Sequence, residues 1–220
     1  MSTLEYSHDF NHINQETYEL ISKEFSETRA YVWKCIKDFT ELIKNKKENN
    51  PNILEIGCGN GKNMHYLLNN VPCNLIGVDT CQNFIDLCLS SNLNVKKNNI
   101  INLDFNDSTF DYILCIATFH HLLEETDKTK GMKEIIRVMK SGAIGIITCW
   151  STEQPDDSKF NFHDGINIVM WKGRTDLNKT RYYYVYSYTM FFEFFTSFKE
   201  IEILKIYNEV GNWILLFKKK

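Results

Sequence analysis

Three of the ten glycines lie in one short segment, Glu55-Ile-Gly-Cys-Gly-Asn-Gly61. Glycines permit positive φ angles and let a ligand approach the backbone closely, so the segment suits a turn that holds a bound molecule. Asp79 follows 22 residues after Gly57, and a carboxylate at that place can accept both hydroxyl hydrogens of a ribose. The glycine spacing is G-x-G-x-G rather than the dinucleotide pattern G-x-G-x-x-G, and it lacks the Lys-Ser/Thr of a phosphate-binding loop.

A second group of side chains suits recognition of an anion. Arg29 and Arg181 carry guanidinium groups, whose fork of donors matches a carboxylate. His120 and His121 follow a predicted strand, at the edge where open parallel sheets bind ligands. One of these histidines could donate a hydrogen bond to a substrate, or the pair could simply begin a helix and pack.

The elements that position these residues alternate along the chain. Short apolar segments predict strands, and segments with a three-and-four spacing of apolar residues predict helices. The strands are expected at 53–56, 75–78, 93–95, 112–117 and 143–149, and the helices at 62–68, 84–89 and 132–139. Fully apolar strands that alternate with helices indicate a parallel sheet covered on both faces.

The two ends of the chain follow other patterns. Residues 1–50 are typical of a helical cap, and 189–198 of a Phe-rich helix. Residues 200–207 and 213–218 predict a terminal antiparallel hairpin. The polar segment 151–180 is expected to be a loop-like, substrate-side insertion within a single domain spanning residues 1–220.

Composition limits the classes of protein. The chain has 220 residues, a net charge of −3 and 43% hydrophobic residues, which are globular values. Seven cysteines without a Cys-x-x-Cys pair indicate reduced thiols in a cytosolic or nuclear protein and no metal site. The polar N-terminus is unlike a signal peptide, and the longest apolar runs fall short of the roughly 20 residues that cross a bilayer.

The glycine segment, with the acid Glu55 before it and Asp79 after it, resembles the class I S-adenosylmethionine-dependent methyltransferases, whose first motif is E/D-x-G-x-G-x-G. The resemblance implies an α/β Rossmann-like fold with a mostly parallel seven-stranded sheet, a C-terminal antiparallel hairpin and helices on both faces. Asn99 stands where the family has an acid that faces the adenine, and its amide oxygen can still accept from an exocyclic amine. The residues implied to bind the cofactor are Tyr18, Arg29, Glu55, Gly57, Cys58, Gly59, Gly61, Asp79, Thr80, Asn99, Ile100 and Ile116.

Four further segments are similar to one family, the eukaryotic tRNA methyltransferases that esterify 5-carboxymethyluridine at the wobble position. They are Phe25–Trp33, Ile116–Leu122, Cys149–Gln154, and the pair Arg181–Tyr186 with Tyr207–Trp213. The likeness runs from about Thr17 to the C-terminus, although the insertion at 155–180 is shorter than is usual in the family.

This resemblance implies methylation of a carboxylate, which is already ionised at neutral pH and needs alignment and desolvation rather than a general base. The residues implied to act on the substrate are Arg29, His120, His121, Trp150, Arg181 and Asn212. Trp150 could stack on the uracil or pack in the core, Asn212 could be structural in its turn, and Gln154 could bind the base edge.

Partners follow from the same resemblance. The anticodon loop of a tRNA needs cationic surface, and basic residues gather in 128–140 and in 159–181, next to a tyrosine-rich strand. The family works with a small zinc-ribbon activator subunit in a heterodimer. Leu93–Val95 is the expected sheet edge at which that partner could add a strand, near the apolar residues Phe84, Leu87 and Leu89, which are expected to be partly uncovered without it.

Two other functions remain open from the sequence. A methyltransferase of a small molecule, such as a carboxylic acid or a quinone precursor, would share the glycine loop and the histidine pair. A cofactor-binding subunit without catalysis would fit the substitution at Asn99.

Overall fold

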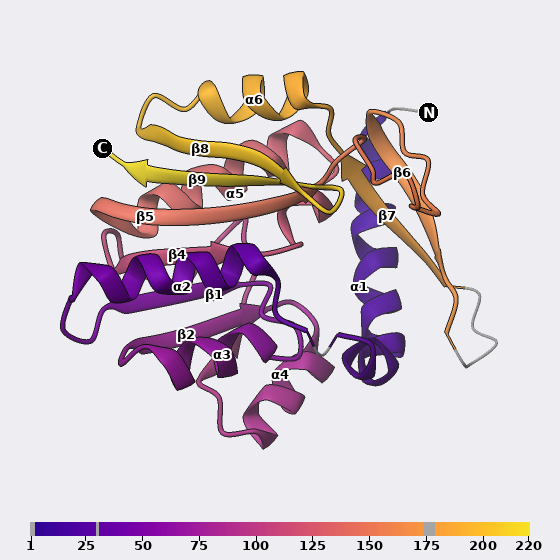
Figure 1. The fold of residues 1–220 in the computed structure, drawn as a ribbon. Coiled ribbons are helices and arrows are strands. Elements are labelled where there is room, and N and C mark those ends of the chain that lie inside the picture. Colours follow the sequence, from indigo (N-terminus) through magenta and orange to yellow (C-terminus); the bar gives the residue numbers. More distant parts are fainter. Residues whose placement is uncertain (1–2, 30, 174–178) are drawn as a thin grey trace.

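The computed structural model describes residues 3–29, 31–173 and 179–220, and its main feature is a seven-stranded sheet in the order β3-β2-β1-β4-β5-β9-β8 (Figure 1). The strands of this sheet are β1 (Asn52–Ile56), β2 (Asn74–Asp79), β3 (Val95–Lys97), β4 (Phe110–Cys115), β5 (Met139–Trp150), β8 (Ile201–Glu209) and β9 (Asn212–Lys219). Strands β1 to β5 pair in parallel, whereas β9 runs antiparallel to both β5 and β8. The predicted Rossmann-like sheet with its C-terminal hairpin is confirmed.

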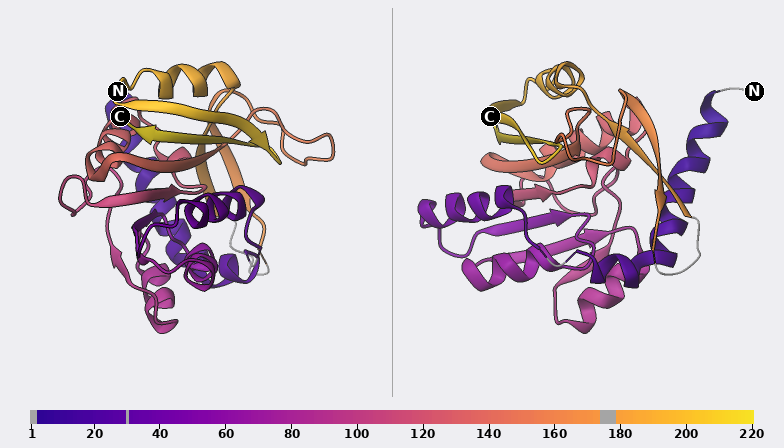
Figure 2. Two further views of the ribbon diagram at one scale, coloured as in Figure 1. Left: turned by 60° about the vertical axis from the view of Figure 1, so that its left-hand side comes forward. Right: turned by 45° about the vertical axis from the view of Figure 1, so that its right-hand side comes forward.

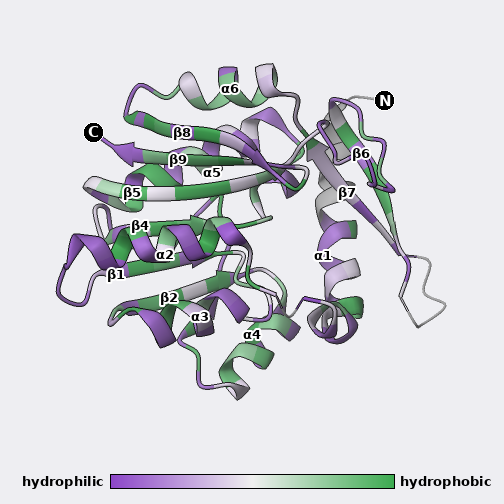
Figure 3. Ribbon diagram, viewed as in Figure 1, coloured by the Kyte–Doolittle hydropathy of each residue, from purple (hydrophilic) through white to green (hydrophobic). Residues whose placement is uncertain are grey.

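Helices cover both faces of the sheet. One face packs against α2 (Lys34–Lys46), α3 (Lys62–Asn70) and α4 (Gln82–Ser90). The other packs against α5 (Glu125–Val138) and α6 (Tyr188–Thr196). Neighbouring residues of one strand serve opposite faces, since Ile53 belongs to the first cluster and Leu54 to the second. The inner strands β1, β4 and β5 are therefore apolar along most of their length (Figure 3).

The edge strand begins two residues later than the sequence predicts. Helix α4 ends in a turn in which Asn92 has a φ of 58° and the amide of Leu93 donates to the carbonyl of Cys88 at 3.0 Å. Because Leu93 completes this helix end, β3 starts only at Val95. The prediction that this strand forms the sheet edge is confirmed.

The prediction of a loop at 151–180 is wrong for part of this segment. Gly165–Trp171 forms β6, which pairs antiparallel with β7 (Lys179–Val185) in a separate two-stranded sheet. Along β6, Val169 and Trp171 are buried, while Ile168 and Met170 are exposed. Since residues on both faces of β6 are apolar, the sequence lacks the apolar-polar alternation that marks a half-buried strand.

The long helix α1 (Thr3–Glu27) stands beyond the carboxyl ends of the parallel strands, alongside β7 and α4 (Figures 1 and 2). A short 3₁₀ turn, η1 (Phe119–His121), follows β4 at the same end of the sheet. Among the described residues, no helix combines the length and the apolar character needed to span a membrane.

Candidate active site

A cavity of about 400 Å³ lies where β1, β2 and β4 end, with α1 along one side, and its size suits a small-molecule cofactor. All the predicted cofactor residues line it except Glu55 and Gly61. Of the predicted substrate residues, Arg29 and His121 line it, whereas His120, Trp150, Arg181 and Asn212 do not. The structure gives these positions, and the roles of the residues stay predictions.

The glycine loop needs its glycines for two different reasons. A Cβ on Gly57, whose φ is 70°, would lie 2.0 Å from the Thr118 hydroxyl, so the loop packs directly against the turn that follows β4. Gly59 has a φ of 52° and would meet nothing within 4 Å, so its side of the loop is open to a ligand.

Asp79 is held in place by the glycine loop itself. Its carboxylate accepts hydrogen bonds from the backbone amides of Gly59 and Cys81, both at 2.9 Å. Burial raises the pKa of Asp79, although these two bonds act in the opposite direction. Each oxygen keeps a lone pair, which matches the predicted contact with the ribose hydroxyls.

Glu55 lies beneath the loop and is fully buried. One oxygen accepts from the amide of Asn63 at 2.7 Å, and the other has no hydrogen-bond partner among the described residues. Burial raises the pKa of Glu55 to about 8. A buried carboxyl with an unsatisfied oxygen suits a site for a cationic ligand, because a nearby positive charge favours the ionised form.

The adenine side of the predicted cofactor site combines apolar and amide groups. Ile100 and Ile116 are buried side chains on the cavity wall. Asn99 is exposed and lines the cavity, and its side-chain oxygen accepts from the amide of Ile101 at 3.2 Å. Together with Asp79, this set fits the adenosine of S-adenosylmethionine, while Glu55 lies outside the cavity lining.

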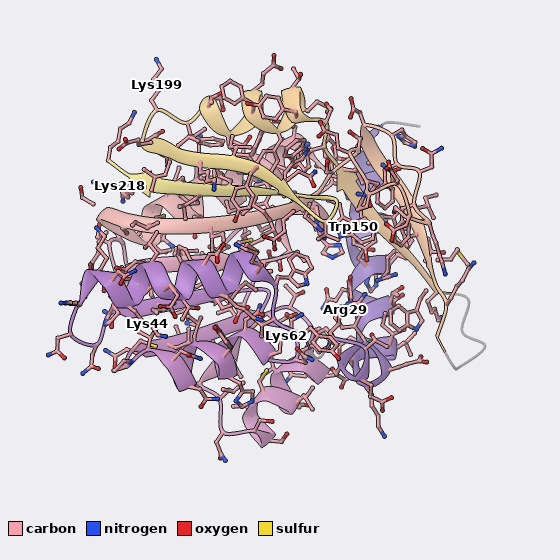
Figure 4. All side chains as sticks on the ribbon, in the orientation of Figure 1. Arg29, Lys44, Lys62, Trp150, Lys199 and Lys218 are labelled. Carbon is pink, nitrogen blue, oxygen red and sulfur yellow. The ribbon has the colours of Figure 1, made fainter. Side chains whose placement is uncertain are left out.

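Two cations share one wall of the cavity, Arg29 and Lys62. The Arg29 guanidinium lies 4.8 Å from the centre of the Phe25 ring, and the Lys62 ammonium lies 5.9 Å from that of Trp33. Burial lowers the pKa of Lys62, and the charge of Arg29 adds to this effect. Lys62 was not predicted from the sequence as a site residue, although its position directly after the glycine loop indicates a place next to the ligand. Figure 4 shows both residues on the side next to α1.

The histidine pair belongs to a network of aromatic groups. His121 Nε2 lies 3.1 Å from the hydroxyl of Tyr18, and that hydroxyl lies 3.1 Å from the hydroxyl of Tyr183. Burial lowers the pKa of His121 to about 4. His120 accepts from the amide of Trp150 at 3.2 Å, and burial lowers its pKa well below the ordinary value. Both imidazoles are neutral at pH 7.

The remaining predicted substrate residues lie behind this network. The Trp150 ring stacks on Tyr183 with 4.4 Å between centres. Arg181 is buried, its guanidinium lies 5.0 Å from the Trp171 ring centre and 5.4 Å from that of Tyr183, and its Nε has no hydrogen-bond partner in the part of the chain that the structure describes. Asn212 is buried at the start of β9 and donates to the carbonyl of Val210. These side chains support the cavity wall from behind.

Gln154 does not present its amide to a base edge. It donates to the carbonyls of Ser151 and Gly211 at 2.7 and 2.8 Å, and its oxygen accepts from the hydroxyl of Ser158 at 3.2 Å. These contacts tie the start of the insertion to the β8–β9 turn, so Gln154 is a structural residue.

The two basic stretches are less available than their sequence suggests. In 128–140, Lys128 is buried and pairs with Glu125, Arg137 pairs with Glu134 and Asp107, and Lys140 pairs with Asp111. Lys130 and Lys133 remain exposed. In 159–181, Lys159 and Lys172 are exposed, Arg181 is buried, and Arg174 lies outside the described residues.

Known proteins agree with this geometry. The family described as "Methyltransferase domain" matches residues 54–147. A tRNA (carboxymethyluridine(34)-5-O)-methyltransferase of Arabidopsis thaliana is 35% identical over 141 residues, which cover 64% of this chain and 33% of that protein. A protein of Encephalitozoon cuniculi that bears a methyltransferase name is 29% identical over 174 residues, covering 77% of this chain and 78% of that protein. The crystal structure of a SAM-dependent methyltransferase from Methanosarcina mazei matches with a TM-score of 0.65 at 19% identity, covering 81% and 96% of the two chains.

The chain spans only about a third of the Arabidopsis relative, and the solved structure shows the fold alone. The sequence matches and the fold nevertheless point the same way. The chain has the fold of the class I S-adenosylmethionine-dependent methyltransferases, carries a methyltransferase domain over residues 54–147, and is similar in sequence to the tRNA (carboxymethyluridine(34)-5-O)-methyltransferases.

Proposed function

We propose that this methyltransferase acts on tRNA and converts 5-carboxymethyluridine at the wobble position of the anticodon to its methyl ester. The names of relatives such as the Arabidopsis protein support a tRNA substrate. The segments that carry Arg29, His121 and Arg181 support the carboxylate as the methyl acceptor.

In this proposal the chain's own residues bind and orient the two reactants. Asp79 would hold the ribose of S-adenosylmethionine, and Ile100 and Ile116 would flank its adenine. When bound, the cofactor supplies a methyl group on a sulfonium. The chain must align an oxygen of the substrate with that methyl group and exclude water from it. Arg29 would hold the other carboxylate oxygen by a charge-assisted hydrogen bond.

The main observation behind the proposal is that one cavity is lined by both a cation, Arg29, and a weakly basic histidine, His121. Arg29 gives the wall a positive charge that suits an anionic substrate. His121, with its pKa lowered to about 4, is a poor base for a hydroxyl or an amine. A carboxylate substrate needs no proton removed, so this site suits methyl ester formation.

The test is mass spectrometry of tRNA nucleosides from cells that lack this protein. We expect carboxymethyluridine to accumulate and its methyl ester to disappear, and an unchanged nucleoside profile would contradict the proposal. Restoring the gene with Arg29→Gln should lower the ester by about tenfold or more, since a charge-assisted hydrogen bond is lost. Isothermal titration with S-adenosylmethionine would show whether that loss lies in cofactor binding instead.

One observation favours a second candidate, methylation of a small carboxylic acid. The buried or paired state of Lys128, Arg137 and Lys140 removes cationic surface that a tRNA would use. Binding of labelled tRNA across a salt series separates the two candidates. A steep loss of affinity with salt supports tRNA, and a lack of binding at low salt supports the small substrate.

We also propose that a small zinc-ribbon activator subunit binds at the β3 edge of the sheet. Val95–Lys97 presents an unpaired strand edge there, and the nearby Leu87 and Leu89 are 38% and 52% exposed. Phe84, which was expected to be partly uncovered, is buried against α1 and contributes nothing to that surface. If the chain alone is monodisperse and fully active, an obligate activator is wrong.

A further inference from the structure

Helix α1 forms one side of the cofactor cavity. Five of its residues line the cavity, namely His12, Asn14, Gln15, Tyr18 and Phe25. The helix reaches the cavity by lying across the carboxyl ends of the parallel strands (Figure 2). Its position therefore decides whether the cavity is closed.

One carboxylate joins α1 to the start of α4. Glu19 accepts hydrogen bonds from the backbone amides of Gln82 at 2.6 Å and Asn83 at 3.0 Å, and from the thiol of Cys81 at 3.3 Å. In return the side-chain amide of Asn83 donates to the backbone carbonyl of Glu19 at 2.7 Å. Burial acts to raise the pKa of Glu19, but these backbone bonds outweigh it and lower the pKa.

The N-terminus of helix α4 is not capped by the side chain of its own N-cap residue, so the Glu19 carboxylate is not redundant there. Its N-cap residue is Cys81, which makes no side-chain capping bond. The first amides of a helix need acceptors, and a negative charge at that end interacts favourably with the helix dipole. Glu19 thus caps α4 from another helix, and the cap exists only while α1 is in place.

The capped segment is the one that carries the ribose acid. The amide of Cys81 donates to Asp79 while its thiol donates to Glu19, so this residue is held from both sides. Asp79 lines the cavity and also binds the glycine loop through the amide of Gly59. A shift of α1 would therefore move Cys81, and through Cys81 it would disturb Asp79, the predicted ribose contact.

Further contacts fasten α1 on either side of Glu19. The Asn14 amide pairs with the backbone of Tyr182 in β7, at 2.8 Å and 2.7 Å. Near the other end, the Asn60 amide of the glycine loop donates to the carbonyl of Ser26 at 3.3 Å. Thr17, Tyr18 and Glu24 make further hydrogen bonds to β7, to His121 and to the indole of Trp171, so α1 is attached to several segments around the cavity.

We propose that Glu19 is a positioning residue that latches α1 over the cofactor cavity and sets the residence time of the bound cofactor. Closure and binding are linked, because a cofactor in the cavity would contact both α1 and the segments that α1 holds. Breaking the latch lowers the population of the closed state, which raises the apparent Kd and speeds dissociation. The inference concerns the cofactor alone and holds whatever the methyl acceptor is.

The test measures S-adenosylhomocysteine binding to the whole chain by titration calorimetry and by stopped-flow dissociation. Glu19→Ala should raise the Kd and the dissociation rate by about tenfold, and Glu19→Gln, which keeps the side-chain size, should give a smaller rise in the same direction. Glu16→Ala is the matched control, since it removes the same charge from an exposed site one turn away and should leave both values unchanged.

A purely structural role for Glu19 predicts a different result. Cys81→Ser gives α4 a side-chain cap of its own, so adding it to Glu19→Ala should restore thermal stability without restoring the bridge to α1. We expect the double variant to regain its melting temperature yet keep the fast dissociation, relative to Cys81→Ser alone. Recovery of the dissociation rate together with stability would overturn the latch, as would an unchanged Kd in both Glu19 variants.

Discussion

At the scale of single residues, Gly57 and Gly59 occupy one loop but are needed for different reasons. Both have positive φ, and only Gly57 has a neighbour where a Cβ would go. We expect Gly57→Ala to cost roughly 2–5 kcal/mol of unfolding free energy, because strain and a clash with Thr118 add together. Gly59→Ala, the matched control, should cost roughly 1–2 kcal/mol from strain alone. Equal losses in urea unfolding would contradict the packing role of Gly57.

Glu55 should make stability depend on pH in an unusual direction. Its pKa is raised from 4.5 to about 8 in the fold, so between these pH values the folded chain holds a proton that the unfolded chain has lost. Its contribution to stability is thus full below about pH 4.5 and is lost as the pH rises through about 8. Glu55→Gln cannot ionise. Its melting temperature, relative to that of the unmodified chain, should therefore rise as the pH increases from 5 to 9.

This comparison is made without cofactor, and Glu16→Gln serves as the exposed control. A difference between Glu55→Gln and the unmodified chain that stays constant over this pH range would show that Glu55 is ionised in the fold.

At the scale of elements, α5 is anchored by an arginine that the sequence suggests for RNA binding. Arg137 donates to both oxygens of Glu134 at 2.7 and 2.8 Å, and to the carbonyls of Leu103 and Phe105, both at 2.7 Å. These bonds hold the segment after Asn99, on the adenine side of the cavity, against the helix. The residue therefore positions an element.

Arg137→Ala should lower the free energy of unfolding by roughly 2–3 kcal/mol, because it leaves two partly buried carbonyls without donors. Lys133→Ala, on an exposed position of the same helix, should change it by less than about 0.5 kcal/mol. Chemical denaturation of both variants is the measurement. A larger effect of the two substitutions on tRNA affinity than on stability would restore the RNA-binding reading of α5.

At the scale of the whole molecule, the main sheet has two edges with different surroundings. The β3 edge lies next to the exposed Leu89 of α4, and the β8 edge carries the exposed Leu204. If the activator subunit binds at β3, Leu89→Arg should abolish its co-purification with this chain, while Leu204→Arg at the opposite edge should not. Loss of the partner with Leu204→Arg alone would place the interface at β8.

The sequence by itself determined the fold and the cofactor loop, because both depend on local patterns. Apolar strands alternating with helices specify the parallel sheet, and the spacing from Glu55 to Asp79 specifies the ligand loop. Tertiary structure alone decided which charges reach the cavity. Arg181 is buried between aromatic rings and Lys128 lies under Tyr184, whereas Lys62 faces the cavity. It also placed α1 over that cavity, since contacts such as Glu19 with Gln82 join residues far apart in the chain and leave no trace in local spacing.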